Sequence, residues 1–98
     1  MRESLIETRA VAKAKIRGWL TRKLQWVGRR GAPDRVFVGE KEPCLLCGNR
    51  AVIVFVEFKA PGEEPRALQK KEISRLQERG VRVLVVDSME DVDGIFEA

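Results

Sequence analysis

The chain has 98 residues, of which 44% are hydrophobic and none is histidine, and its formal net charge is +4. This length suits a single domain, residues 1–98, and the lack of histidine excludes Ser–His and Cys–His catalytic pairs as well as zinc sites with histidine ligands. No apolar run approaches the ~20 residues of a membrane helix, and residues 1–20 carry charges throughout, so we expect a cytoplasmic protein with no membrane partner.

Residues 4–20 are predicted to form a helix. Its apolar stripe would consist of Leu5, Ala12, Ile16 and Trp19. Glu7 lies on a narrower face of small residues, and two roles are open for it. The Ser4-x-x-Glu7 spacing matches a capping box, whereas a helix packed on a sheet could direct Glu7 towards a site there.

The next segments are a strand at 23–27, a loop at 28–33, a strand at 34–38 and a long turn at 39–49. Residues 1–35 hold ten lysines and arginines but three acids. Such a basic segment indicates a polyanionic partner, with nucleic acid first, although a solvated helix face is the plain alternative. The candidate contacts are Lys23, Arg29, Arg30 and Arg35.

The strongest strand, 51–59, ends in the run "VFVEFKAPG". Glu57 and Lys59 point to the same side because side chains alternate along a strand. Both sides of the strand are mostly apolar, so we expect a central strand covered on both faces. Its charges lie at its carboxyl end, where open α/β sheets place ligands. A surface ion pair is the alternative.

Asp34 opens the preceding strand, directly after Pro33. If the strands at 34–38 and 51–59 pair as a hairpin, the start of one lies beside the end of the other. Asp34 would then lie close to Glu57 and Lys59, although an isolated aspartate here is more often a turn residue.

A helix is predicted at 66–79, ending before Gly80, followed by a buried strand at 81–86 and a short helix at 88–98 with Ser88 as N-cap. A helix that links two strands implies a parallel pair. The order α-β-β-β-α-β-α therefore predicts an α/β fold with a mixed sheet flanked by helices. Gln69 lies in the first turn on the core side, where it would either cap the backbone or orient a site residue.

Two carboxylates without histidine suit a hard cation such as Mg²⁺ or Mn²⁺. Lys59 beside them would lower the pKa of an attacking water or stabilise the charge of a transition state. Together with a basic flank, these groups indicate hydrolysis of a phosphodiester bond.

The pattern Pro33-Asp34 followed by Glu57-x-Lys59 resembles the PD-(D/E)xK nuclease signature, and with Glu7, Gln69 and "GVRVLVVDS" it resembles the VRR-NUC (virus-type replication-repair nuclease) family. The resemblance implies the restriction-endonuclease-like αβββαβ core and a catalytic role for Lys59 and Gln69. It also implies a basic residue, Lys23, near the scissile phosphate. The metal ligands it implies are Asp34, Glu57, the backbone carbonyl of Phe58 and, through water, Glu7.

The chain resembles the stand-alone members of that family, which come from phages and bacteria. This resemblance implies a homodimer that cleaves branched DNA such as Holliday junctions. Alternatives are a DNA-binding module without catalysis and another nuclease of the superfamily with a different substrate. Candidates for an apolar dimer surface are Trp19, Leu20, Trp26 and Phe96.

Cys44 and Cys47 form a Cys-x-x-Cys-Gly sequence in the turn between the two carboxylate-bearing strands. This is half of a zinc knuckle, and a complete Cys₄ site would need two chains. Two reduced thiols in a hairpin are the favoured reading.

Overall fold

The computed structural model describes residues 2–40, 45–48 and 50–97, and its elements follow the predicted order. They are α1 (Glu3–Arg17), β1 (Leu20–Lys23), β2 (Arg35–Glu40), β3 (Ala51–Phe58), α2 (Ala67–Glu78), β4 (Arg82–Val86) and a closing 3₁₀ helix, η1 (Glu90–Phe96). The Oγ of Ser88 accepts a hydrogen bond from the Asp91 N–H, which helps to start η1. Within the described residues, no helix is both long enough and apolar enough to span a membrane.

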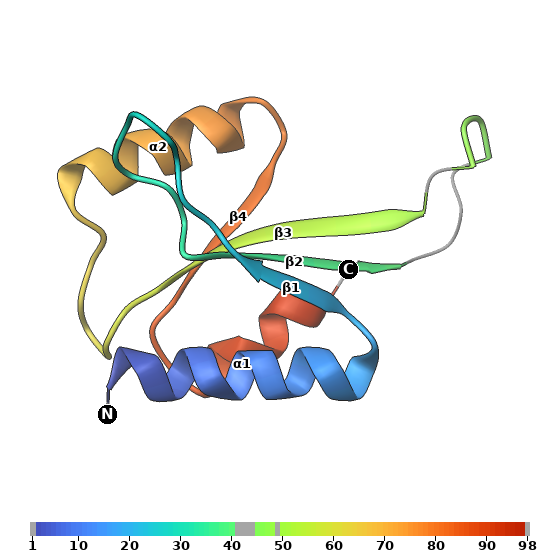
Figure 1. Ribbon diagram of the computed structural model, residues 1–98, viewed down its shortest axis with the longest axis horizontal. Coiled ribbons are helices and arrows are strands. Elements are labelled where there is room, and N and C mark those ends of the chain that lie inside the picture. Colours follow the sequence, from blue (N-terminus) through green and yellow to red (C-terminus); the bar gives the residue numbers. More distant parts are fainter. Residues whose placement is uncertain (1, 41–44, 49, 98) are drawn as a thin grey trace.

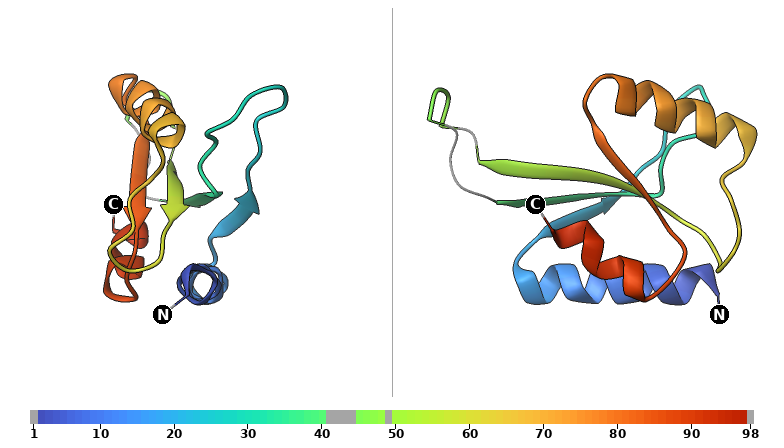
Figure 2. Two further views of the ribbon diagram at one scale, coloured as in Figure 1. Left: turned by 90° about the vertical axis from the view of Figure 1, so that its left-hand side faces the viewer. Right: turned by 180° about the vertical axis from the view of Figure 1, so that it is seen from behind.

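The four strands form one mixed sheet in the order β1-β2-β3-β4. The β1/β2 and β2/β3 pairs are antiparallel, and β3 pairs in parallel with β4, as the helix between them predicts. Figure 1 shows α1 and η1 on one face of the sheet and α2 on the other. Seen from the end in the left panel of Figure 2, the layers are α1 with η1, the sheet, and α2. The predicted α/β class with flanking helices is confirmed.

The main core lies between the sheet and the layer of α1 and η1. Alternate residues of β3 point into it, and Phe37 of β2 packs edge-on against Phe58 and Phe96, with centroid distances of 6.3 and 5.9 Å. The buried residues of this cluster include Val54, Val56, Phe58, Val86, Val92 and Ile95. The β3 side chains on this face lie two residues apart, which fits the period of a strand.

The predicted apolar stripe of the first helix is wrong. Leu5 is 53% exposed and Ile16 85% exposed, whereas Ile6, Ala10 and Ala14 are fully buried. The two alanines allow the helix backbone to approach the sheet closely, which longer side chains would prevent. The face with the smaller side chains therefore packs inwards, and α1 ends at Gly18, whose φ of 74° reverses the chain.

The opposite face of the sheet is covered over only part of its length. Ile73 of α2 packs there and is 8% exposed, but Ile53, in the amino half of β3, remains 50% exposed. The expectation of a strand covered on both sides is right for the carboxyl half of β3 and wrong for its amino half. The reason is geometric, because β2 and β3 extend past the helices towards residues 45–48 (Figure 1).

The first strand is displaced from its predicted range of 23–27. Because Gly18 turns the chain sharply, β1 begins at Leu20, pairs with Val38, and ends at Lys23. One predicted dimer contact is wrong, because Phe96 is 7% exposed and lies in the core. The Trp19 ring packs edge-on against Phe96 at 5.2 Å and remains partly exposed. Trp26 lies outside β1 and hydrogen-bonds to α2, whereas Leu20 remains 48% exposed.

Candidate active site

Asp34 stands where β2 leaves β3. The last paired residues are Arg35 and Val56, so the next residue of each strand, Asp34 and Glu57, face each other as the hairpin prediction requires. Beyond this point the carbonyl oxygen of Asp34 accepts a hydrogen bond from the Leu24 N–H at 3.0 Å. Its carboxylate Oδ2 accepts the Phe58 N–H at 2.7 Å. The Asp34 side chain thus accepts the backbone N–H of Phe58 in place of a β2 carbonyl oxygen. This hydrogen bond fixes the Asp34 carboxylate at the end of β3.

The loop before Asp34 is held against α2. Gly31 has a φ of 97°, and a Cβ atom there would come within 2.9 Å of the carbonyl oxygen of Leu68 and the Cγ of Glu72. Pro33 is fully buried. A side chain at residue 31 would therefore be strained twice, by the left-handed backbone and by contact with α2. The packing of Gly31 and Pro33 therefore fixes the position of Asp34, which follows them in the chain.

Glu57 is a buried carboxylate with one oxygen unpaired. It is 1% exposed, and its Oε2 lies 3.3 Å from the Nζ of Lys59, whose side chain is 12% exposed. Its Oε1 has no hydrogen-bond partner among the described residues. Burial, followed by the charge of Asp34, raises the pKa of Glu57 to about 7, while Lys59 acts in the opposite direction. A group of this kind is costly to the fold and typical of a functional site.

These groups fit a divalent cation. A buried carboxylate oxygen without a donor, close to a second carboxylate, is the arrangement that a hard cation satisfies. Within the described ranges no group of three Asp, Glu, Cys or His side chains converges, so water, a backbone carbonyl or a phosphate oxygen would complete the shell. Mg²⁺ commonly binds in this way. The carbonyl of Phe58, directly after Glu57, stays a predicted ligand.

Glu7 does not form the predicted capping box. The helix begins at Glu3, and the Oε2 of Glu7 instead accepts Arg35 Nε at 2.6 Å and lies 3.2 Å from Lys23 Nζ. Burial raises the pKa of Glu7, but the hydrogen bonds from Arg35 and Lys23 outweigh it and lower that pKa overall. Glu7 therefore anchors α1 to the edge of the sheet through two cations, and its role as a water-mediated ligand stays a prediction.

Glu3 is a site candidate that the sequence reasoning missed. Its charge contributes to the raised pKa of Glu57, so it lies within electrostatic reach of the buried carboxylate. The signal available in the sequence was its position in the first turn of α1, one turn before Glu7. That turn reaches the end of the sheet where Asp34 and Glu57 meet.

Gln69 acts as a cap in this structure. Its Oε1 accepts the Arg66 N–H at 2.9 Å, which satisfies a free donor at the start of α2. This is one of the two roles expected from the sequence. Its catalytic role stays a prediction.

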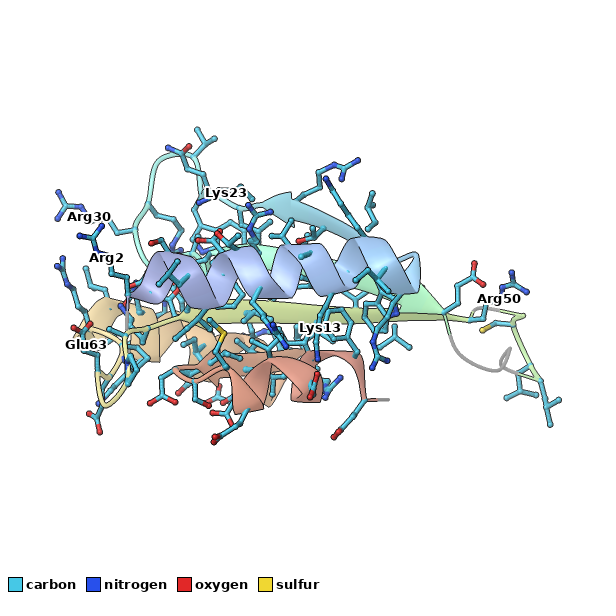
Figure 3. The ribbon with its side chains drawn as sticks, turned by 90° about the horizontal axis from the view of Figure 1, so that it is seen from below. Arg2, Lys13, Lys23, Arg30, Arg50 and Glu63 are labelled. Atoms are coloured by element: carbon cyan, nitrogen blue, oxygen red, sulfur yellow. The ribbon has the colours of Figure 1, made fainter. Side chains whose placement is uncertain are left out.

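Three of the four predicted DNA contacts are already in ion pairs. Lys23 and Arg35 bind Glu7, and Arg29 Nη2 lies 2.6 Å from Glu72 Oε1. Arg30 is exposed and forms no ion pair with any residue that the structure describes. Figure 3 shows Arg30 and Arg2 at the end of the molecule where α1 begins. Arg30 and Arg2, which is also exposed, are thus the cations most available near this end.

Cys47 is exposed and forms no disulfide with any residue that the structure describes. Cys44 lies outside the described residues, so the half zinc knuckle stays a prediction.

Comparison with known proteins agrees with this geometry over the whole chain. No protein-family model matches the sequence. The chain is 38% identical over 98 residues, its full length, to "Putative nuclease p44" of Acyrthosiphon pisum secondary endosymbiont phage 1, and the match covers 95% of that protein. A solved structure described as "VRR_NUC domain" superposes with a TM-score of 0.78 at 35% identity. That alignment covers 96% of this chain and 92% of the other.

Proposed function

We propose that this chain, which belongs to the VRR_NUC family of nucleases, is a divalent-metal-dependent endonuclease that cleaves branched DNA as a homodimer. The observation that supports the metal dependence is the buried Oε1 of Glu57, which has no donor among the described residues, on a carboxylate whose pKa the charge of Asp34 also raises. We place this activity in the cytoplasm of a bacterial or phage-infected cell, in line with the phage relative.

Each residue of the site has a distinct task in this chemistry. Asp34 and Glu57 would hold Mg²⁺ or Mn²⁺, which when bound supplies an activated water and positive charge at the scissile phosphate. Lys59 already lies 3.3 Å from Glu57, so its ammonium can hydrogen-bond to a phosphate oxygen beside the carboxylates. The β3/β4 pairing holds this lysine, since its backbone N–H donates to the Val86 carbonyl at 3.0 Å. A donor fixed before reaction stabilises developing charge without rearranging.

A DNA-binding module without catalysis is disfavoured by the cost of Glu57. A buried carboxylate with a raised pKa lowers the stability of the fold at neutral pH. Binding DNA phosphates requires cations and gains nothing from this group. Retaining Glu57 beside Asp34 and Lys59 is understandable if a cation binds there.

The homodimer is supported by symmetry and by exposed apolar surface. Resolving a four-way junction requires two nicks on opposed strands, and a two-fold dimer supplies two related sites. Leu45 and Leu46 are almost fully exposed. A hollow of about 500 Å³ on the thinly covered face of the sheet is lined by residues that include Ile53, Phe55 and Val81. We propose this face as the dimer interface, since Phe96 of the set first expected there is buried.

The test is a cleavage assay with three DNA substrates: a four-way junction, a flap and a linear duplex. Each is incubated with Mg²⁺, Mn²⁺ or EDTA. We expect paired, symmetric nicks in the junction with either metal and none in EDTA or with Glu57→Gln. Equal cleavage by Glu57→Gln, purified in parallel, would refute the assignment of the site.

Light scattering at micromolar concentration checks the dimer and should give about twice the chain mass of 11.1 kDa. Glu substituted for Ile53 should give the monomer mass, whereas Glu substituted for the exposed Ile16 on α1 should not. If the protein is a monomer and makes single nicks, the proposed dimer is refuted, whereas the proposed metal-dependent cleavage is not.

A further inference from the structure

The second helix carries a basic face that the charge balance of the sequence conceals. Residues 36–98 are acidic overall, yet residues 66–79 contain five lysines and arginines and two acids. Ile73 packs on the sheet, and Gln77 Nε2 donates to the Val83 carbonyl at 3.2 Å. Lys71 and Arg75 lie half a turn away from Ile73 and are exposed. The basic face of α2 therefore points to solvent.

The acids of α2 neutralise this face only in part, because Glu72 pairs with Arg75 while it also binds the loop. Glu72 is shared, since its Oε1 lies 2.6 Å from Arg29 Nη2 and 3.2 Å from Arg75 Nη1, while Trp26 Nε1 donates to its Oε2 at 3.2 Å. Lys71 forms no ion pair with the part of the chain that the structure describes. Arg79 donates to the carbonyl oxygen of Arg75 at 2.8 Å, which leaves its charge uncompensated.

Glu72 also joins α2 to the loop that precedes Asp34. The loop reaches it from two sides, through Trp26 and Arg29, and Gly31 packs directly against the helix backbone. The exposed Arg30 lies between these anchors. The exposed cations of α2 and Arg30 thus belong to two segments that pack together, and the loop leads on to Asp34.

We propose that this surface, formed by Lys71, Arg75 and Arg79 of α2 with Arg30 of the loop, binds the phosphate backbone of a duplex arm next to the cleaved strand. The proposal rests on the proposed nuclease function. Lys71, Arg75 and Arg79 are spaced by four residues, so they form one stripe with a rise of roughly 6 Å per step. Phosphates of one strand follow at about 3.4 Å along the duplex, so the stripe spans several of them.

A hollow on the outer side of α2 could bind one such phosphate. Its volume is about 430 Å³, and it is lined by Lys70, Lys71, Ser74, Arg75 and Glu78. The ammonium of Lys70 is engaged with Glu64 at 2.9 Å. Lys71 and the hydroxyl of Ser74 remain as donors, joined by Arg75, which shares Glu72 with Arg29, while the negative charge of Glu78 limits how many anionic groups can bind. The hollow therefore suits one backbone phosphate, which carries a single negative charge, better than a cluster of acidic side chains, which carries several.

The experiment measures DNA binding by Lys71→Ala as a function of salt, in EDTA so that no cleavage occurs. Losing one phosphate contact should weaken binding roughly fivefold at 0.1 M salt and reduce the slope of log K against log salt by about 0.9. Lys71→Arg should restore both. The matched control is Lys15→Ala, an exposed lysine at the far end of α1, which should behave as wild type. With metal, Lys71→Ala should raise KM and leave kcat unchanged.

The outcomes separate this inference from the proposed function. If wild type cleaves DNA and Lys71→Ala matches Lys15→Ala in affinity and salt slope, the α2 surface is wrong and the nuclease stands. If Lys71→Ala loses binding and salt slope while wild type shows no metal-dependent cleavage, the surface stands and the nuclease proposal fails. A loss of affinity with an unchanged salt slope would also overturn the proposed phosphate contact.

Discussion

Replacing Glu57 with glutamine should stabilise the metal-free protein at neutral pH while removing its activity. Glutamine keeps the shape of the protonated carboxyl group and removes the buried charge. The raised pKa of Glu57 means that the folded chain keeps the proton to about pH 7, whereas the unfolded chain releases it near pH 4.5. Between these values a rise in pH favours the unfolded chain, so the stability of wild type falls as pH rises through this window.

The size of the effect follows from the two pKa values. The interval from 4.5 to about 7 corresponds to about 3 kcal/mol, at about 1.4 kcal/mol for each pH unit. Because Glu57 is almost fully buried, solvent screening does not reduce this figure much. The advantage of Glu57→Gln over wild type should be about 1 kcal/mol at pH 5 and about 3 kcal/mol at pH 8. For a domain of this size that predicts a rise in Tm on the order of 10 °C or more at pH 8.

The assay is urea unfolding of both proteins in EDTA at pH 5, 6, 7 and 8. Titrating groups far from Glu57 contribute alike to both chains and cancel in the difference, whereas Asp34 and Lys59 interact with Glu57 and belong to the measured effect. Glu64→Gln is the control, because Glu64 is fully exposed and its hydrogen bond from Lys70 lowers its pKa. This substitution should therefore change the free energy of unfolding only slightly, and should lower it where Glu57→Gln raises it. A difference between wild type and Glu57→Gln that stays constant from pH 5 to 8 would refute the reasoning about the buried charge.

Three further predictions concern neighbouring groups. Lys59→Ala should lower kcat on the order of 10²-fold, and its pH–rate profile should shift to higher pH because Lys59 no longer opposes the raised pKa of Glu57; an unshifted profile would contradict their coupling. Glu7→Ala should cost about 1–3 kcal/mol in urea unfolding, because Arg35 is 17% exposed and loses its partner, with the loss largest above the lowered pKa of Glu7. Gly31→Ala should lower Tm and speed tryptic cleavage of the loop before Asp34. Gly28→Ala carries only the strain of its left-handed backbone (φ 80°), with open space around the added Cβ, so it should lower Tm less than Gly31→Ala.

The centre of the site could be predicted because it depends on local rules. Side chains alternate along a strand, which places Glu57 and Lys59 on one side. An antiparallel hairpin brings the start of one strand to the end of the other, which places Asp34 beside them. The observed register, with Arg35 opposite Val56, agrees with this expectation. The parallel pairing of β3 with β4 followed in the same way from the helix that joins them.

The packing of the helices needed the tertiary structure. Leu5 and Ile16 are exposed, although their spacing is helical, because the sheet accepts the face of Ala10 and Ala14. Periodicity shows that a helix has an apolar side, but when two sides carry apolar residues the choice depends on how closely each can approach the partner surface.

The sequence by itself determined the order of the elements and the meeting of Asp34, Glu57 and Lys59, since each follows from residues close in the chain or from one hairpin, whereas the bounds of β1 did not follow from it. The tertiary structure alone decided the partners of the charged groups. Glu7 binds Arg35 across 28 residues, and Glu72 binds Arg29 across 43. Such pairs depend on how elements that are distant in the sequence pack against each other. Packing also sets the protonation of Glu57, since burial, followed by the charge of Asp34, raises its pKa to about 7.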